Sequence, residues 1–380
     1  MNPNYAGPSV PQGQANSRFL LGLLHSAQQC NAANLDCCPN SSLLSSPPYE
    51  HSKEIEHGHP HTASRSRRPQ VLQFEQVPAQ APGAGEVWLE QTAIGVNPLD
   101  LSQRSGAVPV ALPCGLGLEG AGLVKAIGPG VTQVQVGDRV AYATGPLGAY
   151  ASARLYPAER LVKLPPQLGS DAAAALLFKG ITSQYLLKST YPVGPGTRVL
   201  IYGAAGALGQ LMVPWAKHLG ATVIGVVSKA QSIERARAAG CDEVLVFDAA
   251  TLAQQVVEIT QGHKVDVVYD PIGRVSFEAS LDSLRPRGLL VSFGATSGAP
   301  DAVQVGTLNA KGSLFLTRPS LAAHTASASE YQARAADVLD AFAAGIIQPR
   351  IWQRYPLAEV AQAHADLHDG RAQGAIVLIP

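Results

Sequence analysis

Residues 204–209 (Ala-Ala-Gly-Ala-Leu-Gly) have the types and spacing of a turn that can hold the phosphates of a nucleotide. An apolar run at 199–202 leads into this turn, a helical stretch ends at Gly220, and a β-branched run follows at 222–227. A strand, a glycine-rich turn, a helix and a second strand within about thirty residues predict one Rossmann βαβ unit. The alternative is a buried turn between strand and helix that binds no ligand.

Two glycines of this turn have distinct physical roles. Gly206 lets the backbone come close to a pyrophosphate, and Gly209 lets the helix pack closely on its strand. The start of the helix adds amide donors and the positive end of its dipole, both of which favour phosphate.

The end of the second strand indicates which dinucleotide would bind. An NAD site usually has Asp or Glu about twenty residues past the glycines, where it bonds the ribose 2′-hydroxyl. Here the strand runs into Val227-Ser228-Lys229, without an acid. A hydroxyl and an ammonium suit a 2′-phosphate, so the sequence favours NADPH. The alternative is that Lys229 is a solvated surface lysine.

The composition narrows the class of protein. The chain has 380 residues, enough for two domains, and its 28 basic and 28 acidic residues balance, so no basic face for nucleic acid is expected. No apolar run approaches the roughly eighteen residues that span a bilayer, and no secretory signal is seen. The 5 cysteines are too scattered for a disulfide framework. We expect a cytoplasmic enzyme with a small-molecule substrate and no membrane partner.

Residues 1–68 differ from the rest and are predicted to be a disordered extension. They are rich in Ser, Pro, Asn and His and show no sustained hydrophobic period. The spacing of His57, His59 and His61 is compatible with a metal, but such a tract in a flexible tail is more often solvated.

The elements that must position these residues follow from hydrophobic periodicity and turn signals. A β domain is expected from residue 69, and a doubly wound parallel sheet from the βα alternation after the Rossmann unit. The last sixty or so residues are expected to return to the first domain. The expected strands are 72–77, 86–94, 120–127, 139–143, 161–164, 199–202, 222–227, 243–246, 265–270, 288–293 and 374–378. The expected helices are 170–187, 230–239, 252–260, 276–284, 329–344 and 357–368, besides that of the Rossmann unit.

With these pieces in place, a series of motifs from residue 69 to residue 380 resembles the medium-chain dehydrogenase/reductase superfamily, most of all the zinc-free quinone oxidoreductases of the zeta-crystallin type. The motifs are AIGVN at 93–97, GLG at 115–117, VGDRV at 136–140, LGAY at 147–150, KGIT at 179–182, VVYD at 267–270, VSFG at 291–294, KGSL at 311–314 and TRPSL at 317–321. The resemblance implies an α/β protein with a GroES-like β domain plus a Rossmann domain with a doubly wound parallel sheet. Its parts would be a GroES-like catalytic domain (69–178), an NADPH-binding domain (179–318) and a return to the catalytic domain (319–380).

The resemblance also implies site residues. Asn97 and Asp100 would lie near the nicotinamide end of the cofactor, in the cleft between the domains, as the catalytic positions, and Asn97 would be able to donate to a developing oxyanion. The cofactor-binding residues would be Asn97, Tyr185, Gly206, Ala207, Leu208, Ser228, Lys229, Ser232, Phe247, Ile272, Phe293, Gly294, Thr296, Pro319, Ser320, Leu321 and Arg371. For the aromatic residues and Ile272, a core role is an equal alternative.

No metal is expected. Zinc-dependent relatives carry a ligand cysteine where this chain has Asn97, and a histidine where it has Leu118, before Glu119. Neither Asn nor Leu can replace a thiolate or an imidazole. Glu119 is therefore expected to be structural or solvated.

The implied activity is metal-free transfer of hydride or electrons from NADPH to a quinone, by a homodimeric enzyme. An NADPH-dependent reductase of enones shares the fold and the cofactor, and a non-catalytic NADPH-binding protein of the zeta-crystallin kind is a third hypothesis. Two departures bear on these implications. Ser102 and Val108 stand where close relatives keep tyrosines in the substrate cleft, which removes stacking area. The usual first strand is missing or altered, and only residues 52–56 resemble it.

Overall fold

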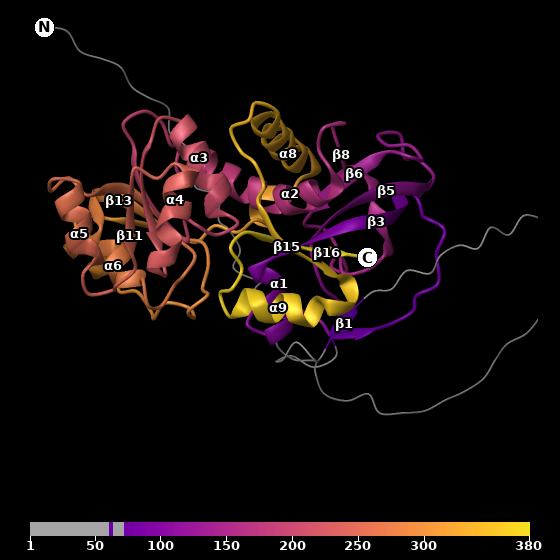
Figure 1. Ribbon diagram of the computed structural model, residues 1–380, viewed down its shortest axis with the longest axis horizontal. Helices are drawn as coiled ribbons and strands as arrows, with labels where there is room; N and C mark the ends of the chain where they lie inside the picture. Colours follow the sequence, from indigo (N-terminus) through magenta and orange to yellow (C-terminus); the bar gives the residue numbers. More distant parts are fainter. Residues whose placement is uncertain (1–60, 64–71) are drawn as a thin grey trace, which may run out of the picture. The chain divides into compact units, whose positions relative to one another are not determined.

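The computed structural model describes residues 61–63 and 72–380 (Figure 1). The rest of the predicted disordered extension, with His57, His59 and residues 52–56, lies outside the described residues. Within that extension, His61–Ala63 form a strand, β1.

Strand β1 is paired on both sides, although disorder was predicted for residues 1–68. It pairs antiparallel with β2 (Leu72–Phe74), His61 lying opposite Phe74, and with β4 (Cys114–Gly115), Thr62 lying opposite Gly115. The three strands form a small sheet in the order β2-β1-β4. A hairpin therefore precedes the main β domain, although its first strand has no apolar pattern by which the sequence could reveal it.

The main β domain is a seven-stranded sheet in which residues far apart in the chain become neighbours. Its order is β15-β16-β3-β5-β6-β8, and β7 pairs with β3. Neighbours are antiparallel except β15 and β16. The strands are β3 (Glu86–Val96), β5 (Glu119–Ile127), β6 (Arg139–Ala143), β7 (Ala153–Pro157), β8 (Val162–Lys163), β15 (Ile351–Pro356) and β16 (Ala375–Ile379).

The second sheet has six parallel strands in the order β11-β10-β9-β12-β13-β14, which is the Rossmann order. Both faces of β9 are buried: Val199 and Ile201 face one core cluster, and Leu200 and Tyr202 another. Such strands read as unbroken apolar runs. The strands are β9 (Arg198–Tyr202), β10 (Thr222–Val227), β11 (Glu243–Val246), β12 (Val265–Asp270), β13 (Leu284–Ser292) and β14 (Phe315–Thr317).

Helices cover both faces of the six-stranded sheet. Buried residues of α3 and α4 belong to the first core cluster, and those of α5 and α6 belong to the second. The doubly wound architecture is therefore confirmed. The helices are α1 (Pro98–Ser105), α2 (Ser170–Tyr185), α3 (Gly209–His218), α4 (Ile233–Ala239), α5 (Leu252–Ile259), α6 (Phe277–Asp282), α7 (Val305–Ala310), α8 (Ala328–Ala343) and α9 (Val360–His368).

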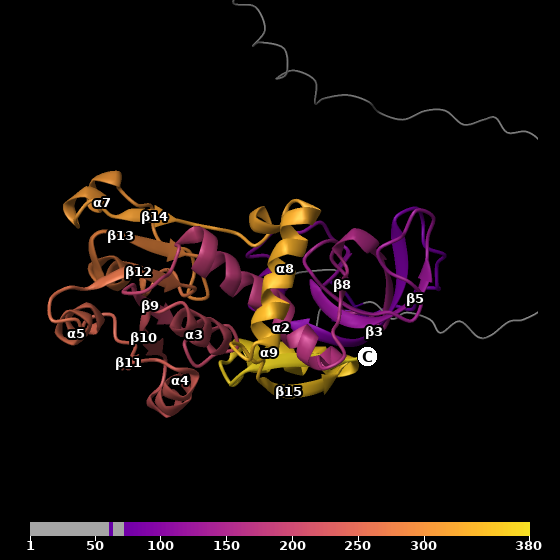
Figure 2. The same ribbon diagram turned by 90° about the horizontal axis from the view of Figure 1, so that it is seen from above.

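Helix α2 links the two sheets. It packs against β3, β5 and β6 of the first sheet, against α3 and against α8 (Figure 2). Gly180 makes the approach to α8 possible, because a Cβ there would lie 2.5 Å from Val338 Cγ1. Helices α8 and α9 and strand β16 thus bring the end of the chain back to the first sheet.

Candidate active site

The glycine turn joins β9 to α3 in the way the sequence predicts. Gly203 has φ of 66°, and its carbonyl accepts a hydrogen bond of 2.8 Å from the Gly206 amide. A Cβ at position 209 would lie 2.3 Å from that same carbonyl oxygen, so only glycine fits where α3 begins. Ala207 and Leu208 lie directly before the helix, and their side chains are half-buried. The turn and the helix start thus have the geometry expected from the sequence, and pyrophosphate binding there stays a prediction.

Ser228 and Lys229 lie at the same edge of the sheet as this turn. Strands β9 and β10 are parallel, with Tyr202 opposite Val226, so their carboxyl ends meet. Ser228 and Lys229 are exposed and Ser232 is half-buried. In the described part of the chain Lys229 makes no ion pair. An exposed ammonium without a carboxylate partner beside the glycine turn is compatible with the predicted contact to a 2′-phosphate.

Phe247 follows the next strand and packs into the core. Its ring meets the Tyr202 ring edge-on, with centroids 5.8 Å apart, and it contacts the second core cluster. The half-buried ring thus packs against the core, and its contact with a cofactor stays a prediction.

Asp270, at the end of β12, shapes the turn that carries Ile272. Its buried carboxylate accepts hydrogen bonds from the Ile272 and Gly273 amides, and from the Ser276 and Ser280 hydroxyls. The sequence reasoning assigned no role to Asp270 beyond its motif. It organises the carboxyl edge of the sheet at this point.

The segment after β13 is fastened to the Asp270 turn. The amides of Phe293 and Gly294 donate to the Asp270 carbonyl, and the Thr296 amide donates to the Pro271 carbonyl. A Cβ at Gly294 would lie 2.4 Å from Pro271 O, so the close approach requires glycine. Four predicted cofactor residues, Ile272, Phe293, Gly294 and Thr296, therefore share one edge with the glycine turn.

The segment that follows β14 reaches Tyr185 of α2. Arg318 donates to the carbonyls of Ser292 and Gly294, which places Pro319 and Ser320 beside that edge. Leu321 is buried in the same cluster as Tyr185. The Tyr185 ring stacks on His324, with centroids 4.3 Å apart and planes 11° apart.

Arg371 lies in the turn between α9 and β16. It forms ion pairs of 2.6 Å with Asp366 and 2.8 Å with Asp369. Two residues on, the Gln373 carbonyl accepts a hydrogen bond of 3.0 Å from Gln210 of α3. The structure thus brings the Arg371 turn to the start of α3.

Asn97 and Asp100 begin α1 and are both buried. Asn97 Nδ2 donates to Glu119 Oε2 at 3.0 Å, and Lys179 Nζ lies 3.1 Å from the same oxygen. The other Glu119 oxygen accepts from the Phe178 amide at 2.7 Å. Glu119 is therefore structural, as one of the two alternatives held, and both its oxygens are engaged. Asn97 Oδ1 has no hydrogen-bond partner in the described part of the chain.

Asp100 is held by one of its oxygens only. Oδ2 accepts from the Asn97 amide at 2.9 Å and from the Tyr150 hydroxyl at 2.8 Å, whereas Oδ1 has no partner among the described residues. Burial raises the pKa of Asp100 to about 7, although the Asn97 amide, Tyr150 and Lys179 all lower it. This carboxyl group can thus change its protonation state near neutral pH.

Asp100 is connected by hydrogen bonds to three residues that the sequence analysis did not single out: Tyr150, His364 and Arg104. The Tyr150 hydroxyl lies 2.8 Å from His364 Nε2, and His364 Nδ1 lies 2.9 Å from Arg104 Nη1. All three are buried. A signal existed for His364: it shares the buried face of α9 with Val360 and Ala363, where a histidine must find polar partners.

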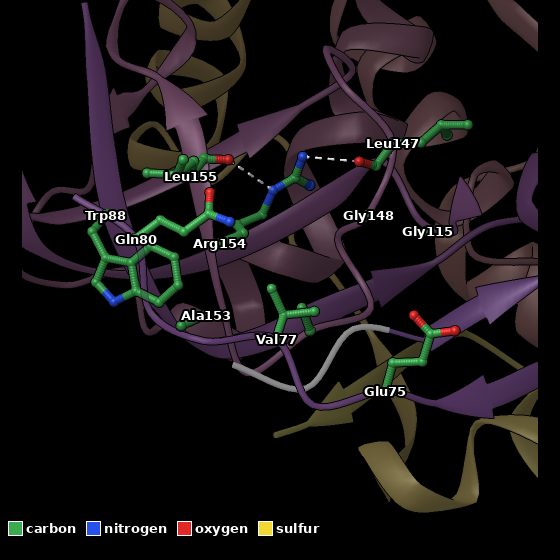
Figure 3. A pocket seen from close by; sticks show the side chains of 11 residues that line it. Glu75, Val77, Gln80, Trp88, Gly115, Leu147, Gly148, Ala153, Arg154 and Leu155 are labelled. Carbon is green, nitrogen blue, oxygen red and sulfur yellow. Dashed lines mark hydrogen bonds between the residues drawn. The ribbon is translucent and has the colours of Figure 1, made fainter. Parts of the chain in front are cut away.

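A pocket of about 320 Å³ lies elsewhere, against the outside of the first sheet (Figure 3). Trp88, Arg154 and Leu155 line it, together with the loop at Leu147 and Gly148. None of the predicted cofactor or catalytic residues borders it.

Within the described ranges, no group of three or more His, Cys, Asp and Glu residues is placed to hold a metal ion. No helix in those ranges is long and apolar enough to cross a membrane.

Comparison with known proteins identifies the family. Residues 83–166 match the alcohol dehydrogenase GroES-like domain, and residues 207–340 match the zinc-binding dehydrogenase domain. The quinone oxidoreductase of Pseudomonas aeruginosa is 44% identical over 313 residues, which cover 82% of this chain and 96% of that protein. The chain belongs to the quinone oxidoreductase family of medium-chain dehydrogenases/reductases. The family resemblance and the predicted pairing of a GroES-like domain with a Rossmann domain are both confirmed.

Two further comparisons, one with a solved structure and one with a related sequence, bear on the activity. The crystal structure of Escherichia coli quinone oxidoreductase complexed with NADPH superposes with a TM-score of 0.82 and 40% identity, covering 85% of this chain and 100% of that chain. A 2-haloacrylate reductase from a Burkholderia species is 45% identical over 320 residues, covering 82% of this chain and 96% of that protein. These relatives are oxidoreductases, and this chain shares their architecture over nearly their whole length.

Proposed function

We propose that this chain is an NADPH-dependent quinone oxidoreductase that acts without a metal ion. The observation that carries the proposal is the match to the Escherichia coli enzyme, complexed with NADPH, over that chain's whole length. When bound, NADPH supplies the hydride. The protein's own residues have to bind the cofactor, orient the substrate and manage the proton.

The residues at the carboxyl edge of the parallel sheet suit this cofactor. Gly206, Ala207 and Leu208 would hold the pyrophosphate at the start of α3. Ser228, Lys229 and Ser232 would hold the 2′-phosphate, where a carboxylate would repel it. The nicotinamide end would lie among the hydrogen-bonded Asp270 turn, the segment after β13 and the segment of Pro319, Ser320 and Leu321, with Tyr185 and Arg371 at its sides.

Asn97 and Asp100 would face the reacting end. Asn97 Nδ2 is engaged by Glu119, whereas Asn97 Oδ1 has no partner among the described residues. This favours a role in which Asn97 Oδ1 accepts a hydrogen bond from the bound ligand. A buried acceptor without a donor costs about 1–3 kcal/mol, so a bound ligand that donates there would gain affinity. The absence of a metal is supported by the engagement of both Glu119 oxygens.

A second candidate function is reduction of an activated carbon–carbon double bond. It is favoured by the 2-haloacrylate reductase relative, which is as similar as the quinone oxidoreductases. A panel of quinones and enones assayed with NADPH and with NADH separates the two. We expect quinone turnover with NADPH. Turnover of enones alone would favour the second candidate, and tight NADPH binding without any turnover would refute both.

We also propose a cytoplasmic homodimer. The two cysteines in the described ranges, Cys114 and Cys241, are free, as is usual in a reducing compartment. Strand β14 ends the parallel sheet, with Phe315 60% exposed, and such an edge can pair with a second copy. Light scattering of the wild type and of Phe315→Lys tests this. We expect a dimer that weakens in the variant, and a monomeric wild type would contradict it.

A further inference from the structure

A buried chain of hydrogen bonds runs from Arg104 through His364 and Tyr150 to Asp100. Its direction is fixed by chemistry. An arginine can only donate, so His364 Nδ1 must accept from Arg104. Nε2 then carries the ring hydrogen and donates to the Tyr150 oxygen. The Tyr150 hydrogen points to Asp100 Oδ2.

This polarity decides which oxygen of Asp100 can carry a proton. Oδ2 already accepts from the Tyr150 hydroxyl and the Asn97 amide, so a proton on that atom would displace one of these donors. Oδ1 accepts nothing in the described part of the chain. The titrating proton therefore belongs on Oδ1.

We propose that Asp100 is the proton donor of the reaction, and that Tyr150 and His364, held by Arg104, are positioning residues that keep its proton on Oδ1. This inference rests on the proposed function. In the step, the O–H bond of Asp100 breaks, its electron pair stays on the carboxylate, and the proton goes to the substrate atom that reduction has made negative. The new carboxylate keeps the two donors on Oδ2 and takes a proton from solvent after product release.

The surroundings of Asp100 suit a group that must gain and lose a proton. The charged and titratable groups that face it are Arg104 on its own helix, Tyr150 on the loop before β7, His364 on α9, Glu119 on β5 and Lys179 on α2. Lys179 lowers the pKa of Asp100, and Glu119, to which Lys179 is bound, raises it. Burial therefore remains the dominant influence, and its effect is to raise the pKa of Asp100.

The test compares Tyr150→Phe with Tyr142→Phe. The second is a matched control, because Tyr142 is also a fully buried tyrosine of the same core cluster whose hydroxyl donates to a side chain, here Gln91. The first readout needs neither cofactor nor substrate: infrared titration of the carboxyl band that disappears in Asp100→Asn. The second is the pH dependence of kcat/KM with the substrate that the panel identifies.

In Tyr150→Phe the carboxylate loses a donor, so we expect the Asp100 titration to move upward by about one to two pH units, the size of one lost hydrogen bond to a charged group. The alkaline limb of kcat/KM should move with it, and Tyr142→Phe should move neither. Asp100→Asn should lower kcat about 100-fold or more.

Each contrary outcome has a definite meaning. If the band moves but the rate profile does not, Asp100 is not the proton donor, while the proposed function stands. If neither moves, the chain of hydrogen bonds does not govern Asp100. If the wild type turns over no substrate, the proposed function fails, and the infrared titration still decides the role of Tyr150.

His364 gives an independent check. Glutamine can still donate to Tyr150, whereas leucine cannot, so His364→Gln should keep the wild-type titration and His364→Leu should shift it upward. Equal behaviour of the two variants would remove His364 from the proposal.

Discussion

Asp100→Asn should stabilise the protein near neutral pH and should lose this advantage in acid. The native state holds the Asp100 carboxyl with a pKa of about 7, whereas the group titrates at 3.8 in the unfolded chain. Between these values the native protein binds a proton that the unfolded chain releases, so stability falls as pH rises from about 4 to about 7. Asparagine has the shape of the protonated carboxyl and does not titrate.

The size of the effect follows from the same two values. The difference between 3.8 and about 7 corresponds to at most about 4 kcal/mol of unfolding free energy. Urea unfolding of the wild type and the variant at several pH values from 4 to 7.5 measures it. We expect nearly equal stabilities at pH 4 and a growing advantage of the variant above that.

Asp138→Asn is the control, because folding lowers the pKa of Asp138 and the pH dependence of its contribution to stability has the opposite sign. Hydrogen bonds from Lys163 and from the Gln135 amide hold the pKa of Asp138 below its usual value. Its carboxylate therefore contributes stability above the unfolded pKa, and that contribution is lost as pH falls through the lower native pKa. If the difference in unfolding free energy between the wild type and Asp100→Asn does not change with pH, the reasoning about Asp100 is refuted.

Three further predictions concern the cofactor, the metal and the start of the chain. Lys229→Ala should weaken NADPH binding by about 1–3 kcal/mol and leave NADH nearly unchanged, measured by calorimetry; equal losses would mean that Lys229 does not touch the phosphate. Chelators should leave turnover intact, and elemental analysis of a chain without residues 1–68, and so without the histidine tract, should find substoichiometric zinc, whereas one tightly held zinc per chain would contradict the metal-free proposal. A chain starting at Pro69 lacks β1 and should melt at a lower temperature than one starting at Ser52, because β2 and β4 lose their shared neighbour; identical melting curves would show that β1 contributes nothing.

The sequence predicted the parallel sheet closely, because its signals are local. The predicted strands at 222–227, 243–246 and 265–270 coincide with β10, β11 and β12. Strands buried on both faces read as apolar runs, and a glycine follows or precedes most of the helices between them. In this part the sequence analysis missed α7 and the edge strand β14, and β13 begins at Leu284, within an expected helix.

The elements that were missed are short or depend on distant partners. Helix α1 begins at Pro98, directly after Asn97. It has only 8 residues, most of them polar, so no hydrophobic period marks it. Strand β7 is ordered by pairing with β3, more than sixty positions earlier in the chain at Glu90 opposite Ala153. Such elements are fixed by tertiary contacts, which a single sequence does not display.

The site shows the same division. The glycine turn and the Ser228-Lys229 pair at the same edge of the sheet could be predicted from residue types at fixed spacing. The environment of Asp100 does not, because Arg104, Tyr150 and His364 come together only when three separate segments pack. Sequence reasoning named Asp100 by resemblance but had no access to the burial that governs its proton.

The place of β16 has a consequence for synthesis on the ribosome. All strands of the parallel sheet lie between Arg198 and Thr317, so that sheet can assemble while the nascent chain is still growing. Strand β3 is paired on one side only much later in synthesis, because its neighbour β16 spans Ala375–Ile379, at the end of the chain. Until then an apolar edge of the first sheet stays open to other chains, which is a hazard for aggregation. His364 is also synthesised in this late stretch. The nascent enzyme therefore completes its first sheet at almost the same time as it gains the residue that orients Tyr150 toward Asp100.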